Sequence, residues 1–321
     1  MLEKFITDSF LKYMQMSTTA IAVNNVTKKY GKFKALDDVS FNCEQGKIYA
    51  VLGPNGAGKT TMFRCILGLL NFEGSINIDG KDVRKTGRWV RERIGYLPQH
   101  SAPYEDISVA DNLKFYAGLK GVDNKRVDEV LKEIRLVRFK DRKARALSGG
   151  MKQRLMLGIS QLSDPPILIL DEPTANLDVQ GQLRFRQLLS DLLGKGKCIL
   201  VSTHLLREAH EIRLFHGNVL VINRGKVVGE GGVDDFMGKF DLRDHLLIDI
   251  GTKDPQPMLN ALKKVGFNNA EVNKNQIVVA CGYNDKFTVL QTLNQAGFTP
   301  GSFRVEEPSL EAAFMKMTGS E

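Results

Sequence analysis

Short apolar runs and helical stretches alternate from residue 20 to about residue 240, which predicts an α/β domain with a largely buried sheet. Every residue in the run Ile167–Leu170 is apolar, so this strand is expected to be covered on both faces. The predicted strands of this domain include Val39–Cys43, Lys47–Leu52, Ile94–Leu97, Ile167–Leu170 and Cys198–Ser202.

Strand patterns stop between Gln99 and Gln161, and helical periodicity takes over, most clearly in Val127–Arg138. We therefore expect a helical subdomain over about residues 100–161, inserted into a sheet domain that spans residues 20–240. Two further strands, Val219–Ile222 and Lys226–Glu230, are expected near the end of that domain.

The pattern changes again in residues 241–321, where strands and helices are expected in the order β-α-β-β-α-β, followed by a helix over Leu310–Met317. That order is typical of a small α+β ferredoxin-like domain. The region contains no cluster of catalytic residue types, so we expect a regulatory or docking role. The predicted elements are Leu246–Ile250, Pro257–Val265, Glu271–Val272, Ile277–Cys281, Lys286–Ala296 and Phe303–Glu306.

The longest apolar runs are far shorter than the roughly 20 residues that a membrane-spanning helix needs. Residues 1–19 lack the basic start, apolar middle and cleavage site of a signal peptide. Two interpretations of this segment stay open. Apolar residues at near-helical spacing suggest a short amphipathic helix, whereas Met16 would serve as a natural start and make the preceding residues a dispensable extension.

A chain of 321 residues suits two domains, and its 42% hydrophobic and 26% charged residues are ordinary for a soluble protein. The net charge of +8 is concentrated in Lys120–Arg154, without the interleaved aromatic residues of a base-stacking platform. We therefore expect no specific nucleic-acid partner. The four cysteines are scattered without a CxxC pair, which predicts neither zinc nor disulfides and fits a reducing cytosol.

The run from Gly53 to Thr60 matches the phosphate-binding pattern G-x-x-x-x-G-K-[ST], between a predicted strand and a predicted helix over Thr60–Leu70. Glycines let backbone N–H groups turn toward phosphate oxygens, and the helix N-terminus favours an anion. Lys59 is expected to bridge the β- and γ-phosphates, and Thr60 to bind Mg²⁺. The predicted nucleotide-binding residues here are Gly53, Asn55, Gly56, Ala57, Gly58, Lys59, Thr60 and Thr61.

Two carboxylates follow the predicted strand Ile167–Leu170. A carboxylate at the end of a buried strand beside a phosphate loop can hold Mg²⁺, which is the role expected of Asp171. Glu172 is then the natural general base to polarise an attacking water. An acidic pair before Pro173 could also merely begin a turn, but a phosphate loop without a metal-binding acid would be incomplete.

With these motifs, the run Leu147–Arg154 (LSGGMKQR) resembles the signature of the ATP-binding cassette (ABC) family, and the likeness extends from Ile21 to about Gly232. It implies a P-loop NTPase fold and a head-to-tail dimer that sandwiches two ATP molecules. Ser148, Gly149 and Gly150 would then contact the γ-phosphate held by the other subunit. Small residues at a helix N-terminus expose the backbone donors that such a contact needs.

The resemblance also assigns roles to four single residues. Tyr30 matches the aromatic residue that stacks on adenine, although a lone tyrosine also fits a core position. Gln99 matches the glutamine that touches Mg²⁺ and the attacking water. His204 matches the histidine that senses the γ-phosphate, and Asp178 matches the loop that communicates across the dimer.

The tail from Glu307 to Gly319 looks like the C-terminus of exporter-type ATPase subunits. The resemblance as a whole implies a Mg²⁺-dependent ATPase that powers export through a separate membrane permease, from the cytoplasmic face of the membrane. A second ATPase subunit, expected to be a second copy, would complete the dimer. The alternative is a soluble ABC ATPase in nucleic-acid or metal-cluster work, but neither a long coiled-coil insertion nor a second cassette is present.

Overall fold

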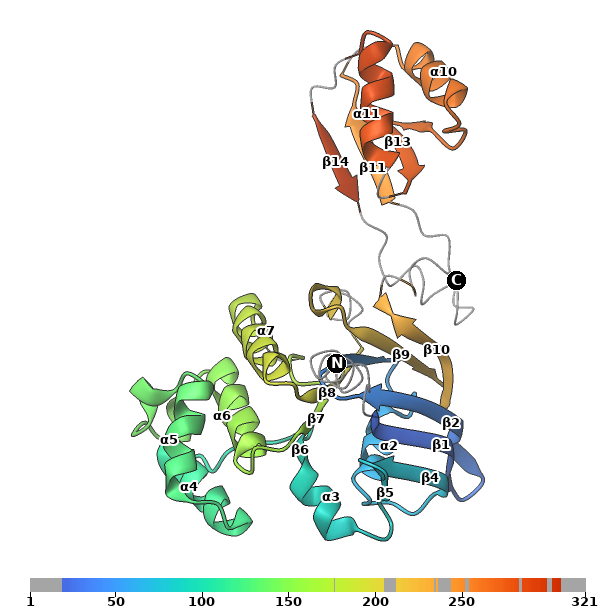
Figure 1. Cartoon of the computed structure of the whole chain (residues 1–321). Coiled ribbons are helices and arrows are strands. Elements are labelled where there is room, and N and C mark those ends of the chain that lie inside the picture. Colours follow the sequence, from blue (N-terminus) through green and yellow to red (C-terminus); the bar gives the residue numbers. More distant parts are fainter. Residues whose placement is uncertain are drawn as a thin grey trace, which may run out of the picture. The chain divides into compact units, whose positions relative to one another are not determined.

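The computed structural model describes residues 19–175, 177–204, 212–233, 235, 244–251, 254–282, 285–298 and 302–306 (Figure 1). The chain divides into two compact units, with the division between Val233 and Asp234, whereas the sequence predicted a boundary at residue 240. The N-terminal segment and the helix expected over residues 310–317 lie outside the described residues, Thr19 excepted.

A six-stranded sheet with the order β10-β9-β3-β8-β7-β6 forms the centre of the first unit. Strand β10 pairs with β9 antiparallel, and the other neighbours run parallel. Three of the predicted strands form the middle of this sheet, where every residue of β3, β7 and β8 is buried. Its strands are β3 (Ile48–Leu52), β6 (Ile94–Leu97), β7 (Ile167–Asp171), β8 (Cys198–Thr203), β9 (Asn218–Asn223) and β10 (Lys226–Gly232).

The parallel register brings chemically important strand ends together. Leu52 of β3 lies opposite Thr203 of β8, and Asp171 of β7 lies opposite Ser202. The loops that leave β3, β7 and β8 therefore share one edge of the sheet, which is where open parallel sheets bind their ligands.

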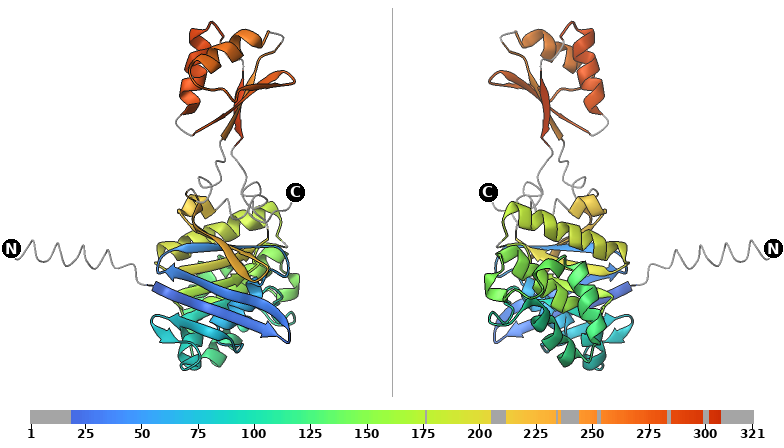
Figure 2. Two further views of the ribbon diagram at one scale, coloured as in Figure 1. Left: turned by 90° about the vertical axis from the view of Figure 1, so that its right-hand side faces the viewer. Right: turned by 90° about the vertical axis from the view of Figure 1, so that its left-hand side faces the viewer.

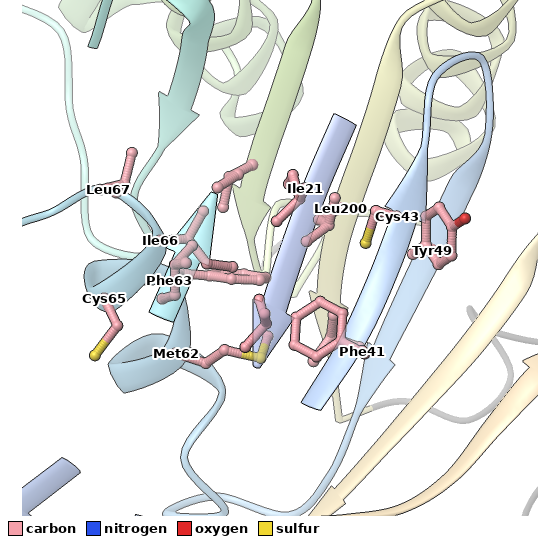
Figure 3. Packing of buried hydrophobic residues seen from close by; sticks show 14 of the residues in the cluster. Ile21, Phe41, Cys43, Tyr49, Met62, Phe63, Cys65, Ile66, Leu67 and Leu200 are labelled. Atoms are coloured by element: carbon pink, nitrogen blue, oxygen red, sulfur yellow. The ribbon is translucent and has the colours of Figure 1, made fainter. Parts of the chain in front are cut away.

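A second, antiparallel sheet has the order β2-β1-β4-β5. Together with helix α2 it encloses a hydrophobic core, in which Met62 and Phe63 of α2 lie near Ile21 and Phe41 (Figure 3). Burial of these large side chains contributes most of the stability of this layer. Its elements are β1 (Thr19–Tyr30), β2 (Phe33–Glu44), α2 (Lys59–Ile66), β4 (Glu73–Ile78) and β5 (Lys81–Asp82).

Most helices of this unit lie on the other side of the six-stranded sheet, opposite the antiparallel strands, whereas α2 lies on the same side as those strands (Figure 2). The group between β6 and β7 corresponds to the predicted helical stretch. Two helix predictions were too long at the C-terminal end. Besides α2, the helices and 3₁₀ turns in the described part of this unit are α3 (Gly87–Arg93), α4 (Val109–Lys120), α5 (Asn124–Glu133), η1 (Val137–Phe139), η2 (Ala144–Ala146), α6 (Gly149–Gln161), α7 (Val179–Gly194) and η3 (Ile212–Phe215).

Left-handed residues account for both corrections. The helix expected over Val127–Arg138 ends at Glu133, because Arg135 has a φ of 57° and turns the chain before the 3₁₀ turn η1. The helix expected to reach Leu70 ends at Ile66, because Gly68 has a φ of 66°. Apolar periodicity continues past both points, so the pattern alone does not mark them.

The second unit has the predicted β-α-β-β-α-β order and an antiparallel sheet with the strand order β12-β13-β11-β14. Apolar side chains from the strands and both helices form its own core. Among the described residues of the chain, none of the helices has the length and apolar character needed to cross a bilayer. The elements are β11 (Asp244–Asp249), α10 (Gln256–Lys264), β12 (Glu271–Asn273), β13 (Gln276–Cys281), α11 (Asp285–Gln295) and β14 (Phe303–Glu306).

Candidate functional site

The predicted phosphate loop connects β3 to α2, and its glycines are required by the surroundings. A Cβ at Gly53 would lie 2.3 Å from the carbonyl oxygen of Ile222. A Cβ at Gly58 would lie 2.7 Å from the carbonyl oxygen of Ala35, and this residue has a φ of 112° that side chains disfavour. The loop is thus held tightly against neighbouring strands while its backbone turns.

We expect Gly53→Ala to destabilise the protein by about 1–3 kcal/mol, because the Ile222 carbonyl is backbone and cannot move aside without disturbing β9. Thermal unfolding without nucleotide measures this. The control is Gly118→Ala inside helix α4, where the new Cβ meets no atom within 4 Å and alanine favours the helix. An unfolding temperature for Gly53→Ala at or above that of the control would contradict the packing argument.

Lys59 begins α2 and is buried, with 5% of its surface exposed. Its ammonium donates to the carbonyl oxygens of Gly53 at 2.7 Å and Pro54 at 3.2 Å, and lies 3.6 Å from the carboxylate of Glu172. Burial lowers the pKa of Lys59, and the charge of Glu172 opposes that shift. A phosphate anion beside this ammonium would favour its charged form further.

A hydrogen-bonded chain joins the end of β7 to β8 and α2. The hydroxyl of Thr60 donates to Asp171 at 2.8 Å, and the hydroxyl of Ser202 donates to the other oxygen of Asp171 at 2.5 Å. Ser202 in turn accepts from the backbone N–H of Glu172 at 2.9 Å. Ser202 was missed as a site residue; its signal was a polar residue near the end of a mostly apolar strand, two positions before His204.

Glu172 is at the centre of the predicted catalytic residues. Its φ of 48° is unusual for a residue with a side chain, and only 8% of that side chain is exposed. The amide nitrogen of Gln99 donates to its Oε2 at 2.9 Å, and Nδ1 of His204 lies 3.2 Å from the same oxygen. The structure therefore brings Gln99, His204 and Lys59 to one buried carboxylate, from four separate segments of the chain.

The oxygen donors at this position fit Mg²⁺. Thr60 offers a hydroxyl, Asp171 a carboxylate and Gln99 an amide, and these hard ligands are the kind that Mg²⁺ prefers. Among the described residues, no group of three or more His, Cys, Asp and Glu side chains could hold a metal ion. That is compatible with Mg²⁺, which usually relies on one or two carboxylates together with phosphates of the substrate.

The other predicted site residues lie outside this cluster. Tyr30 ends β1 with 48% of its surface exposed, and the Lys28 ammonium lies 5.0 Å from its ring centre. Ser148 caps α6 by accepting from the N–H of Met151 at 3.4 Å, and Asp178 caps α7 by accepting from the N–H of Gly181 at 2.9 Å. In the described part of the chain, these caps make no hydrogen bond to the phosphate loop.

The two capped helices nevertheless lie side by side. A Cβ built on Gly150 would be 3.5 Å from the Cα of Gly181 and 4.0 Å from Leu177. The N-termini of α6 and α7 therefore approach each other, and both offer backbone donors to an anion. Gly149 belongs to the first turn of α6, while Asn55, Gly56, Ala57 and Thr61 belong to the phosphate loop and the first turn of α2.

Comparison with known proteins identifies the family. The protein-family model described as "ABC transporter" matches residues 36–175. A daunorubicin resistance ATP-binding protein of Streptomyces coeruleorubidus is 31% identical over 315 residues, which cover 95% of this chain and 98% of the relative. The chain belongs to the ABC transporter ATP-binding proteins. A Nod factor export ATP-binding protein of Rhizobium meliloti is 34% identical over 319 residues, covering 95% of this chain and 89% of the relative.

Solved structures agree with this assignment. The ATP-binding subunit of an ABC transporter covers 69% of this chain and 93% of its own at 30% identity, with a TM-score of 0.60. A dimeric ABC cassette in a post-hydrolysis state with ADP and Pi matches at 29% identity over 66% of this chain and 98% of its own, with a TM-score of 0.58. The predicted fold class and the prediction of an ATP-binding, ATP-hydrolysing transporter subunit are confirmed.

Proposed function

We propose that this ABC ATPase subunit powers export through a separate membrane permease, with Glu172 as the general base of ATP hydrolysis. The observation that carries the proposed chemistry is the single buried carboxylate of Glu172, contacted by Lys59, Gln99 and His204. The export direction is supported by relatives named for drug resistance and for Nod factor export, which match nearly the whole chain.

Some of the site residues bind the nucleotide, and others take part in proton transfer. The loop backbone and Lys59 bind the phosphates, and Tyr30 stacks on the adenine. Thr60, Asp171 and Gln99 would hold Mg²⁺, which would neutralise the charge of the phosphates. Glu172 accepts a proton from the attacking water, and Gln99 and His204 orient the Glu172 carboxylate through its Oε2.

We also propose that two copies of the chain form a dimer in which each ATP is bound between the two subunits. Ser148, Gly149, Gly150 and Asp178 lie at the N-terminal ends of α6 and α7 and would complete the site of a second copy. The described hydrogen bonds of the Ser148 and Asp178 side chains are not made to the phosphate loop of their own chain. Dimeric cassettes among the solved structures support that arrangement. ATP binding would close the dimer, and hydrolysis with product release would reopen it. The location proposed is the cytoplasmic face of the membrane, beside the permease.

Copurification tests the transporter function. The tagged chain, extracted from its own cells in detergent, is expected to carry a multi-spanning membrane protein that mass spectrometry identifies, and the purified complex should hydrolyse ATP faster than the chain alone. Glu172→Gln serves as the control, since its complex should form without the faster hydrolysis. If DNA or RNA accelerates hydrolysis at physiological salt while no membrane protein does, the nucleic-acid alternative replaces this proposal, because non-specific nucleic-acid binding weakens steeply with salt.

A further inference from the structure

Among the described residues, strand β14 of the second unit is hydrogen-bonded to a neighbouring strand along one edge only. It lies at the end of the sheet β12-β13-β11-β14 and pairs on one side with β11 (Figure 1). The N–H of Asp249 donates to the carbonyl of Ser302 at 3.0 Å, and the two strands continue in unbroken antiparallel register. Hydrogen-bonded pairs alternate in such a ladder, so Arg304 and Glu306 direct their backbone groups toward β11. Phe303 and Val305 direct theirs outward, away from the sheet.

The side chains of this edge combine strand-forming and charged residues. Phe303 and Val305 are 54% and 37% exposed, and both favour strands. The strand contains no proline, and its pairing with β11 contains no bulge. Its short length and its charges, Arg304 and Glu306, are features that discourage indiscriminate pairing at an edge. A strand that pairs here must therefore complement these two charges.

The charges on the opposite face of β14 indicate which strand fits. Arg304 and Glu306 form an exposed ion pair at 3.0 Å. If two copies of β14 pair antiparallel with Val305 opposite Val305, then Arg304 of each copy lies opposite Glu306 of the other. Opposite charges across a strand pair stabilise it, and like charges destabilise it. The neighbouring register, with Arg304 opposite Arg304, places like charges together.

We propose that β14 pairs with β14 of a second copy of this chain, with Val305 on the two-fold axis. The outward backbone groups of Val305 would form a hydrogen-bonded pair, and the two four-stranded sheets would become one continuous sheet. Such a contact is isologous, as two-fold symmetry requires. Two short strands bury much less than a standard interface of about 1,600 Å². The contact is therefore weak alone, and strengthens the association of subunits that also meet elsewhere.

Cysteine cross-linking tests the contact and its register in the full chain. The sequence contains four cysteines, and all four are buried in the structure. An engineered thiol on β14 would therefore be the accessible thiol of the chain. Val305→Cys is expected to give a disulfide-linked dimer on mild oxidation, because Cα atoms of a hydrogen-bonded pair lie about 5.5 Å apart. Phe303→Cys is the matched control. Residue 303 lies on the same face as residue 305. In this register the two copies of residue 303 are offset by four residues along the strands, which at about 3.4 Å per residue places them about 14 Å apart.

The contact rests on the proposed ATP dimer for its strength, so cross-linking is compared without nucleotide and with Mg²⁺ and ATP in the Glu172→Gln background. Cross-linking of Val305→Cys should rise with ATP. If chromatography detects the ATP dimer but Val305→Cys does not cross-link faster than Phe303→Cys within it, the β14 contact is wrong while the dimer stands. Equal cross-linking of the two variants would indicate random collision and overturn the proposal, as would faster cross-linking of Phe303→Cys. A Val305→Cys chain that cross-links only to a different polypeptide in membranes would also overturn it, because the edge would then serve a permease.

Charge variants made on Val305→Cys test the recognition itself. Arg304→Glu is expected to slow dimer cross-linking about tenfold, since it replaces two attractive pairs by two repulsive ones. Adding Glu306→Arg restores the complementary pattern and the intrastrand ion pair, so the double charge variant should recover most of the rate. If Arg304→Glu has no effect, or if the added exchange fails to restore cross-linking while circular dichroism shows a folded chain, the self-complementary register is wrong.

Discussion

Glu172→Gln is expected to slow ATP hydrolysis by about 10²–10⁴-fold, which corresponds to roughly 3–5 kcal/mol of lost transition-state stabilisation. Glutamine keeps the shape of the side chain and can still contact Gln99 and His204, but it does not accept the proton of the attacking water. Phosphate release under saturating Mg²⁺ and ATP measures the effect.

ATP binding should survive this substitution, because Lys59, Thr60 and the loop backbone are unchanged. The closed dimer should therefore accumulate with ATP trapped inside, and size-exclusion chromatography with ATP should show it. Glu92→Gln is the matched control. That carboxylate is exposed and paired only with Arg88 in the contacts described, so hydrolysis should be unaffected.

The possible outcomes separate the catalytic proposal from the dimer proposal. Hydrolysis at the wild-type rate would remove Glu172 as the general base. Loss of hydrolysis with intact ATP binding but no dimer would leave the general base in place. It would mean that the shared-site dimer needs the permease or another partner to form.

The sequence predicts the positions of the central sheet and the site loops well, because both depend on local signals. A run of four apolar residues such as Ile167–Leu170, followed at once by Asp171 and Glu172, indicates a buried strand that ends at a polar site. The glycines of the phosphate loop are equally local as a sequence pattern, because the whole motif lies within eight residues. The carbonyls of Ile222 and Ala35 that exclude side chains there come from distant segments and were not predictable.

Features that depend on distant contacts were not predictable in the same way. Ser202 links Asp171 to the backbone of Glu172 only because β7 and β8 are neighbours in parallel register. The two helices that were predicted too long are each followed by a residue in the left-handed conformation, Gly68 and Arg135. A glycine can mark such a position in the sequence, but an arginine does not. The bonds of Arg135 to Gln187 and Asp191 on α7 come from far along the chain.

Lys59→Ala is expected to weaken ATP binding by about 10–100-fold, because hydrogen bonds to charged groups contribute roughly 1.5–3 kcal/mol. The Lys59 ammonium is already placed at the loop by the carbonyls of Gly53 and Pro54, so little reorganisation precedes phosphate binding. Isothermal titration with Mg²⁺ and ATP in the Glu172→Gln background measures the affinity without turnover. The control is Lys85→Ala, a lysine with an exposed side chain.

The loss of Lys59 should also change the oligomeric state, in the opposite direction from Glu172→Gln alone. Without bound ATP there is no phosphate for Ser148 and Gly149 of a second copy to contact, so the double variant should elute as a monomer at ATP concentrations that dimerise Glu172→Gln. Removal of the ammonium also leaves the buried Glu172 side chain without its cation at 3.6 Å, and glutamine at that position avoids an unpaired charge. Unchanged ATP affinity in the double variant, with a folded chain, would show that the phosphates are bound elsewhere than at this loop.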